Sequence, residues 1–301
     1  MAARFSALVV AVQLLLAALA ACSAVRLGMP GIAAAAGGVA SLYVIALMVV
    51  GAAVVVARPG AWPDATRSGA MRRLRVLCAE PLELDMALLR MAAEPRMQRS
   101  ARSGARRGLA APAIVLVHGI ACNRAVWQPL LARLGEAGFG AVHALNLEPL
   151  FGDIDVYALD LSARIAQIKR ETDDRPVVIV AHSMGGLVAR AALRHLTPGT
   201  AGRIVTVATP HHGTALACRF GWICARQMCP GSPWLRALNG AQEGRFALPL
   251  TSLYSLDDNL IIPASSAVLR GARSVELRGV GHLGLLRSAP ALRAIVAELR
   301  G

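Results

Sequence analysis

The sequence has few aromatic residues and a single lysine. Phe, Trp and Tyr together make up 4% of the 301 residues, and Lys169 is the only lysine among 32 Lys and Arg residues. The formal net charge is +14, yet the chain has no dense basic helix with interleaved aromatic residues, so a nucleic-acid-binding surface is not predicted. Hydrophobic residues make up 55% of the chain, which argues against disorder and indicates that part of it lies in lipid.

The sequence also lacks the cysteine spacings that are typical of metal sites. No C-x-x-C motif occurs, and the spacing within the cluster Cys218, Cys224 and Cys229 does not favour zinc. Two states stay open for this cluster: a disulfide in an oxidising compartment, or free thiols in a reducing cytoplasm. We predict no metal and no cofactor.

Two long apolar runs open the chain. Phe5–Val25 and Ile32–Ala57 contain no charged residue, and each has the roughly 20 residues that a helix needs to cross a bilayer. A short glycine-containing turn separates them. The sequence therefore predicts a transmembrane hairpin of two helices within residues 1–57.

The arginines that flank these runs predict the orientation of the hairpin. The turn holds only Arg26, whereas several arginines flank the second run: Arg58, Arg67, Arg72, Arg73 and Arg75. By the positive-inside rule, both ends of the hairpin and everything downstream lie on the cytoplasmic side of a bacterial inner membrane. The alternative is a lipoprotein signal, because Leu19–Cys22 has the form of a lipoprotein cleavage box, and the domain would then be periplasmic.

From residue 112 onward, short apolar runs alternate with amphipathic segments. The segments that predict strands are Ala113–Val117, Ala141–Leu145, Val177–Ala181, Arg203–Ala208, Leu250–Ser255 and Ser274–Leu277. The segments that predict helices are Arg124–Ala137, Asp155–Arg170, Leu187–Leu196 and Ala289–Arg300. This alternation predicts an α/β fold, a mostly parallel sheet with helices on both faces.

Two segments depart from this alternation. Residues 58–111 are arginine-rich and predict a linker with one helical segment, Ala79–Met97, in which Leu82 and Met86 have helical spacing. Residues 211–249 contain glycine, proline and tryptophan and predict a cap insertion over the carboxyl edge of the sheet, where active sites of open α/β sheets lie.

Ser183 is the candidate nucleophile. It follows a predicted buried strand and opens a predicted helix, in the sequence Ala181-His182-Ser183-Met184-Gly185. A sharp strand-to-helix turn requires small residues two positions before and two positions after its tip, which Ala181 and Gly185 provide. Such a turn exposes the serine hydroxyl at the amino end of the helix.

A serine nucleophile needs a base, and the base needs an acid that orients it. His282 lies in a glycine-rich loop after the last predicted strand, so it can reach the carboxyl edge of the sheet. Asp257 and Asp258 follow the preceding strand, and we favour Asp258 because an apolar run follows it. The resulting order Ser, Asp, His along the chain is the one expected for this kind of turn.

Backbone N–H groups are the expected donors to the oxyanion that forms when an acyl group is attacked. The N–H of Met184, directly after the nucleophile, is one candidate. The N–H of Ile120 is the other, because Gly119 permits the turn that aims it after the first predicted strand. His118 is expected to brace this loop by hydrogen bonding.

Together these motifs resemble the α/β-hydrolase superfamily, in particular bacterial triacylglycerol lipases and esterases. The similar sequences are A-H-S-M-G around Ser183, H-G-I ending at Ile120, and Thr209–Thr214, which is similar to the A-P-H-H-G-T sequence of lipases. The resemblance covers about residues 112–300. It implies the α/β-hydrolase fold, a catalytic triad of Ser183, Asp258 and His282, and oxyanion donors at Ile120 and Met184.

The sequence thus predicts a membrane-tethered serine hydrolase that cleaves carboxylic esters through an acyl-enzyme. The predicted parts are the hairpin, the linker 58–111 and a hydrolase domain over 112–301 with its cap. Apolar cap residues such as Trp222 favour a lipid over a small soluble ester. A thioesterase or acyltransferase with the same triad, and a non-catalytic membrane adaptor, are the alternatives.

Overall fold

The structure is a computed structural model of the chain. It describes residues 1–33, 37, 40, 43–44, 69–97, 112–172, 177–242 and 245–300. Most of the second predicted membrane span, Ile32–Ala57, lies outside the described residues. The polar part of the predicted linker, 98–111, also lies outside them.

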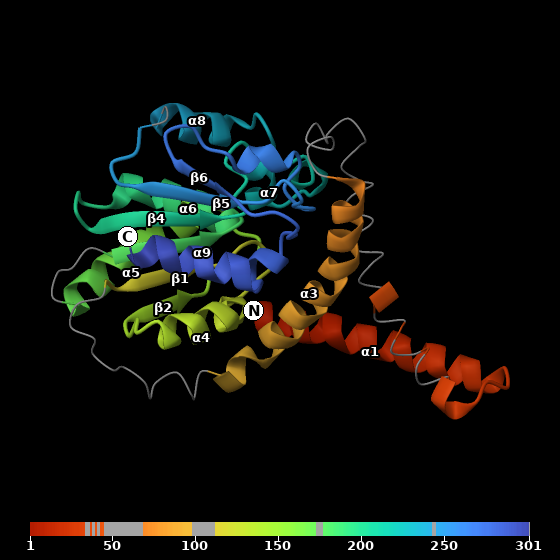
Figure 1. The fold of residues 1–301 in the computed structure, drawn as a ribbon. Helices are drawn as coiled ribbons and strands as arrows, with labels where there is room; N and C mark the ends of the chain where they lie inside the picture. The colour runs from red at the N-terminus through yellow and green to blue at the C-terminus, as the bar shows by residue number, and fades with distance from the viewer. Residues whose placement is uncertain are drawn as a thin grey trace.

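A parallel sheet organises the chain from residue 114 onward (Figure 1). Within the described residues its strand order is β2-β1-β3-β4-β5-β6, and every neighbouring pair is parallel. The strands are β1 Ile114–Val117, β2 Val142–Leu145, β3 Val177–His182, β4 Ala201–Val207, β5 Leu250–Tyr254 and β6 Arg273–Glu276. The six predicted strands are confirmed, with ends shifted by one or two residues.

Helices cover both faces of this sheet. Helices α5 Ile154–Glu171 and α6 Met184–Ala192 cover one face, and α3 Ala70–Met97, α4 Gln128–Glu136 and α9 Ala289–Arg300 cover the other. The remaining helices are α1 Ala2–Arg26, α7 Ile223–Met228 and α8 Pro233–Gln242. The cap prediction over 211–249 corresponds to α7, α8 and their connecting loops. The predicted helix over Arg124–Ala137 begins with a short 3₁₀ segment before α4.

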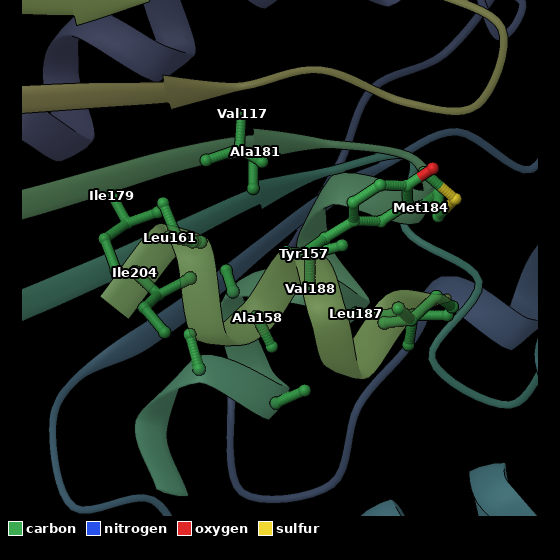
Figure 2. Packing of buried hydrophobic residues seen from close by; sticks show 14 of the residues in the cluster. Val117, Tyr157, Ala158, Leu161, Ile179, Ala181, Met184, Leu187, Val188 and Ile204 are labelled. Carbon is green, nitrogen blue, oxygen red and sulfur yellow. The ribbon is translucent and has the colours of Figure 1, made fainter. Parts of the chain in front are cut away.

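Side chains that alternate along the strands fill two cores, one on each face. Ile179 of β3 packs with α5 and α6, whereas its neighbour Val178 points to the other face and packs with α3, α4 and α9. Figure 2 shows the first core, where Leu161 and Val188 lie in the same cluster as Ile179. Burying such a side chain stabilises the fold by about 1.5–3 kcal/mol, and both cores depend on the strict alternation of the strands.

Helix α3 is longer than predicted, and its buried side is not the side that the apolar spacing predicted. It begins at Ala70 rather than at Ala79 and packs one side against the sheet domain through Leu88 and Met91, which are buried. The apolar spacing that predicted the helix, which includes Leu82, lies on its exposed side. The helix is therefore part of the domain's packing, and its buried side carries carboxylates as well as apolar groups.

Helix α1 corresponds to the first of the two predicted membrane spans, and because most of the second span lies outside the described residues, the hairpin stays a prediction. Among the described residues α1 is the one helix that is long and apolar enough to cross a bilayer. Its small or polar residues Ala2, Ser6, Gln13 and Ala17 are buried, and Gln13 Nε2 donates to Asp85 Oδ1 of α3 at 3.0 Å. One side of α1 is thus used for packing inside the chain, while its leucines remain exposed. In Figure 1, α1 lies against α3 near the N-terminus and extends away from the sheet.

Candidate active site

The turn between β3 and α6 places Ser183 in a backbone conformation that side-chain-bearing residues rarely adopt. Ser183 has φ 56° and ψ −129°, between a strand and a helix. A Cβ at Gly185 would lie 2.5 Å from the carbonyl oxygen of His118, so only glycine fits there. A Cβ at Gly186 would overlap the Thr209 side chain. Strain of this kind persists where the surrounding structure enforces it, and here it holds the serine at the tip of the turn.

His282 and Asp258 lie in direct contact. His282 Nδ1 is 2.8 Å from Asp258 Oδ2, and the other carboxylate oxygen of Asp258 accepts the N–H groups of Leu260 and Ile261 at 2.8 and 2.9 Å. Asp258 is therefore fixed by its own loop and can hold the imidazole in one orientation. With Nδ1 as the donor to Asp258, Nε2 is the nitrogen that can accept a proton.

Asp257, the other candidate acid, has different partners. Its carboxylate pairs with Arg72 of α3 at 2.9 Å and accepts the N–H of Gly279 at 2.7 Å. The structure brings Asp258 to His282 and uses Asp257 to hold the loop between β6 and His282.

His282 lies against the residue that precedes Ser183. The His282 and His182 rings have centroids 4.7 Å apart, and His182 Nε2 is 3.3 Å from the carbonyl oxygen of His282. The N–H of His282 donates to Asn259 Oδ1 at 3.1 Å. Ser183, Asp258 and His282 are buried, with 5%, 2% and 4% of their surface exposed, so the described chain covers this site.

The loop after β1 runs directly against Ser183. A Cβ at Gly119 would lie 2.8 Å from Ser183 Cβ and 3.3 Å from its Oγ. His118 Nε2 accepts the N–H of Leu147 at 3.1 Å, and its Nδ1 is 2.8 Å from the carbonyl oxygen of Gly119. His118 braces the loop as expected, and Ile120 follows the glycine that contacts Ser183. Met184 is the first residue of α6, where backbone N–H groups have no partner within the helix.

The buried histidines beside Ser183, which are His118, His182 and His282, differ in how their surroundings shift their pKa values. Burial lowers the pKa of His118 to about 4 and lowers that of His182 well below its usual value, so both are neutral at pH 7. Burial also acts to lower the pKa of His282, but the charge and hydrogen bond of Asp258 and the charge of Glu80 outweigh it, and the pKa is raised. His282 is the imidazole whose environment favours taking up a proton.

Two residues of α3 reach this site and were missed by the sequence analysis. Glu80 accepts the N–H groups of Leu283 and Gly284, next to His282, at 3.1 and 2.9 Å. Arg72 pairs with Asp257, as described above. A signal for Glu80 was present, because it has helical spacing with Ala87 and falls on the buried side of α3.

Segment 211–249 contains an internal disulfide and contacts the loop before α5 through stacked aromatic rings. Cys218 and Cys229 form a disulfide, while Cys224 is a buried free thiol. Trp222 stacks on Phe151 with ring centroids 4.0 Å apart and on Phe220 at 4.7 Å.

The described residues contain no group of three or more His, Cys, Asp or Glu side chains arranged to hold a metal ion.

The model of the alpha/beta hydrolase family matches residues 114–260, from β1 to the loop that holds Asp258. This segment, just under half of the chain, is that of an α/β hydrolase, and the sheet topology agrees with that fold. The match contains Ser183 and both oxyanion candidates, and it ends before His282. Helix α3 lies before the matched segment.

Solved structures of lipases share this fold. Lipase B from Aspergillus fumigatus is 22% identical with a TM-score of 0.58, over 65% of this chain and 54% of the lipase. The mature lipase BlEst2 from Bacillus licheniformis is 18% identical with a TM-score of 0.56, over 63% of this chain and 92% of the lipase. At these identities the similarity establishes the fold of the α/β hydrolase and leaves its substrate open.

A curated relative is an esterase. The pimeloyl-[acyl-carrier protein] methyl ester esterase of Aliivibrio salmonicida is 29% identical over 110 residues, which is 36% of this chain. The matched part spans 39% of that esterase, so the chain covers well under half of this relative's length. The α/β hydrolase thus has lipases and esterases among its relatives.

Proposed function

We propose that this α/β hydrolase is a membrane-tethered serine carboxylesterase that works through an acyl-enzyme on Ser183. The observation that carries the proposal is the contact between His282 Nδ1 and Asp258 Oδ2, at 2.8 Å, beside the strained turn that bears Ser183. The esterase and lipase relatives support the same reaction class.

In the first half-reaction, Ser183 Oγ attacks the ester carbonyl while His282 Nε2 takes its proton. The N–H groups of Ile120 and Met184 stabilise the oxyanion, and Asp258 stabilises the imidazolium. When the tetrahedral intermediate collapses, the bond to the leaving alkoxide breaks and His282 returns the proton to it. The products are a free alcohol and an acyl group on Ser183.

In the second half-reaction, water replaces the alcohol. His282 takes a proton from the water as its oxygen attacks the acyl carbonyl, and the same N–H groups stabilise the second oxyanion. Collapse of this intermediate releases the carboxylic acid and returns the proton to Ser183 Oγ. No step requires a metal or a cofactor.

Exposed apolar groups around the cap support an ester with an acyl chain. Phe220, Trp222 and Ile223 are exposed at 40%, 39% and 45%, and Trp222 stacks on Phe151. Trp234, by contrast, packs against the core and donates to Asp155 of α5, so it attaches the cap to the domain. The proposed substrate is therefore a lipid or another long-chain ester.

Helix α1 is the proposed membrane tether. It is 25 residues long and its leucines are exposed, as a membrane anchor requires. The disulfide between Cys218 and Cys229 supports an oxidising compartment, and hence the periplasmic side, against the cytoplasmic side favoured by the arginine distribution. Reporter fusions at Gly301 separate the two: activity of a periplasmic reporter supports the first, and its absence with an active cytoplasmic reporter supports the second.

Turnover of nitrophenyl esters of increasing chain length tests the proposal. The full chain in detergent should hydrolyse them, and Ser183→Ala should lower kcat by at least about ten-thousand-fold. Ser162→Ala, on α5, serves as the matched control and should retain activity. A folded wild-type chain without turnover would contradict the proposal, and acyl transfer to an added alcohol or thiol in preference to water would favour the acyltransferase.

A further inference from the structure

A carboxylate from outside the matched hydrolase segment holds the loop that bears His282. Glu80 lies on α3 and its two carboxylate oxygens accept the N–H groups of Leu283 and Gly284 at 3.1 and 2.9 Å. These are the two residues that follow His282. Gly284 also begins a short 3₁₀ helix, so Glu80 caps the amino end of that turn from another part of the chain.

The fit between Glu80 and this loop is close. Glu80 is 2% exposed, and a Cβ at Gly281 would overlap its carboxylate. Glycines on both sides of His282 therefore leave room for the carboxylate: Gly281 before it and Gly284 after it. A buried carboxylate is costly to desolvate unless its oxygens are hydrogen-bonded, and here each oxygen accepts one N–H.

We infer that Glu80 is a positioning residue for His282, which orients the catalytic loop and adds a negative charge beside the imidazole. The inference rests on the proposed esterase function and adds a residue that the family match does not contain. Asp258 fixes His282 through its side chain, and Glu80 fixes the backbone on the other side of the same residue. Asp258 thus holds the imidazole itself, and Glu80 holds the backbone that follows it.

The charge of Glu80 is sensitive to pH. Burial raises the pKa of Glu80 to about 7, although the hydrogen bonds from Gly284 and Leu283 oppose the rise. The titratable groups that face it are His282 and Asp258, while Glu83, one turn along α3, is engaged with Arg287. A protonated Glu80 would lose one acceptor and the charge that favours the imidazolium form of His282.

Steady-state kinetics of the full chain in detergent, from about pH 5 to about pH 9, test this role. Glu80→Gln should lower kcat by about ten-fold, change KM by less than about two-fold, and move the acid limb of kcat/KM to lower pH. The limb moves because removing the negative charge lowers the pKa of His282. Glu83→Gln, on the same helix, breaks the ion pair with Arg287 at the surface. It should match the wild type in kcat, in KM and in the position of the acid limb.

Unchanged kcat and an unchanged acid limb in folded Glu80→Gln would overturn the inference. If that variant fails to fold, Glu80→Asp provides the second test, because it keeps the charge but is too short to reach both N–H groups. It should lower kcat while leaving the acid limb near its wild-type position. Wild-type kcat in this variant would overturn the positioning role.

An NMR titration of the His282 ring in Ser183→Ala separates this inference from the proposed function, because it requires no turnover. Adding Glu80→Gln should lower the pKa of His282, and adding Glu83→Gln should leave it unchanged. If the pKa of His282 does not move, the inference fails even in an active esterase. If the pKa of His282 falls as expected but the wild-type chain hydrolyses no ester, the inference about Glu80 holds and only the esterase function is overturned.

Discussion

The two halves of the candidate site are held in different ways. Ser183 and the loop around Gly119 are placed by the sheet itself, through backbone carbonyls that leave no room for a Cβ at Gly185. The loop that bears His282 is held by side chains, some of which come from α3 near the start of the chain. The first half depends on local sterics, and the second depends on contacts between distant segments.

Helix α3 touches both halves. Near its start and middle it binds the His282 loop, and near its end it binds the loop after β1, where Asn123 Nδ2 donates to the carbonyl oxygen of Met91 at 3.0 Å. Arg124 pairs with Glu94 at 2.6 Å in the same place. A segment outside the family match is therefore part of the structure that supports this site.

Substitutions of the two neighbouring aspartates should differ most in their effect on kcat. Asp258→Asn should lower kcat by about ten-thousand-fold, because the imidazole loses the carboxylate that orients it and stabilises its charge. Asp257→Asn breaks the pair with Arg72 and should lower kcat by less than about ten-fold. Steady-state kinetics of both variants measure this difference. Equal losses of kcat would mean that the site does not distinguish the two acids.

These contacts also mark what could be predicted from the sequence. The strands and the turn at Ser183 depend on neighbours in sequence, so their pattern predicted them. Chain order left Asp257 and Asp258 as candidate acids, and the apolar run after Asp258 favoured that residue. Glu80 and Gly284 are separated by 204 residues, and no local pattern pairs them. The exposed side of α3 was also the more regular apolar one in sequence, because the buried side includes carboxylates.

Paired leucines on α3 test whether that helix belongs to the cooperative unit of the domain. Leu88 is 7% exposed and packs into the core beneath the sheet, whereas its neighbour Leu89 is 52% exposed. Leu88→Ala should lower the free energy of unfolding by about 2–4 kcal/mol, and Leu89→Ala should change it by less than about 0.5 kcal/mol. Denaturant unfolding measures both. If both substitutions changed the free energy of unfolding equally, α3 would not belong to the cooperative unit of the domain.

The disulfide should stabilise the cap without reaching the catalytic groups. Cys218 and Cys229 are 11 residues apart, so their removal as a Ser pair should lower the free energy of unfolding by about 2–3 kcal/mol. Cys78→Ser, at an exposed thiol on α3, is the control and should have little effect. A loss of kcat as large as that of Asp258→Asn would show that the cap and the triad are coupled.

The contact between α1 and α3 should contribute least to the free energy of unfolding. Asp85→Asn retains the shape of the side chain that accepts from Gln13 and removes its charge, so the free energy of unfolding should fall by no more than about 1 kcal/mol. Thermal unfolding in detergent measures this. A change larger than that of Leu88→Ala would mean that α1 supports the domain more strongly than α3 does.

Fluorophosphonate labelling with peptide mapping tests the central claim most directly, because the probe reacts with an activated serine whatever the natural ester is. The wild-type chain should gain one adduct, on the peptide that contains Ser183, and both Ser183→Ala and His282→Ala should remain unlabelled. A folded wild-type chain that stays unlabelled, or an adduct on any other residue, would contradict a nucleophile at Ser183.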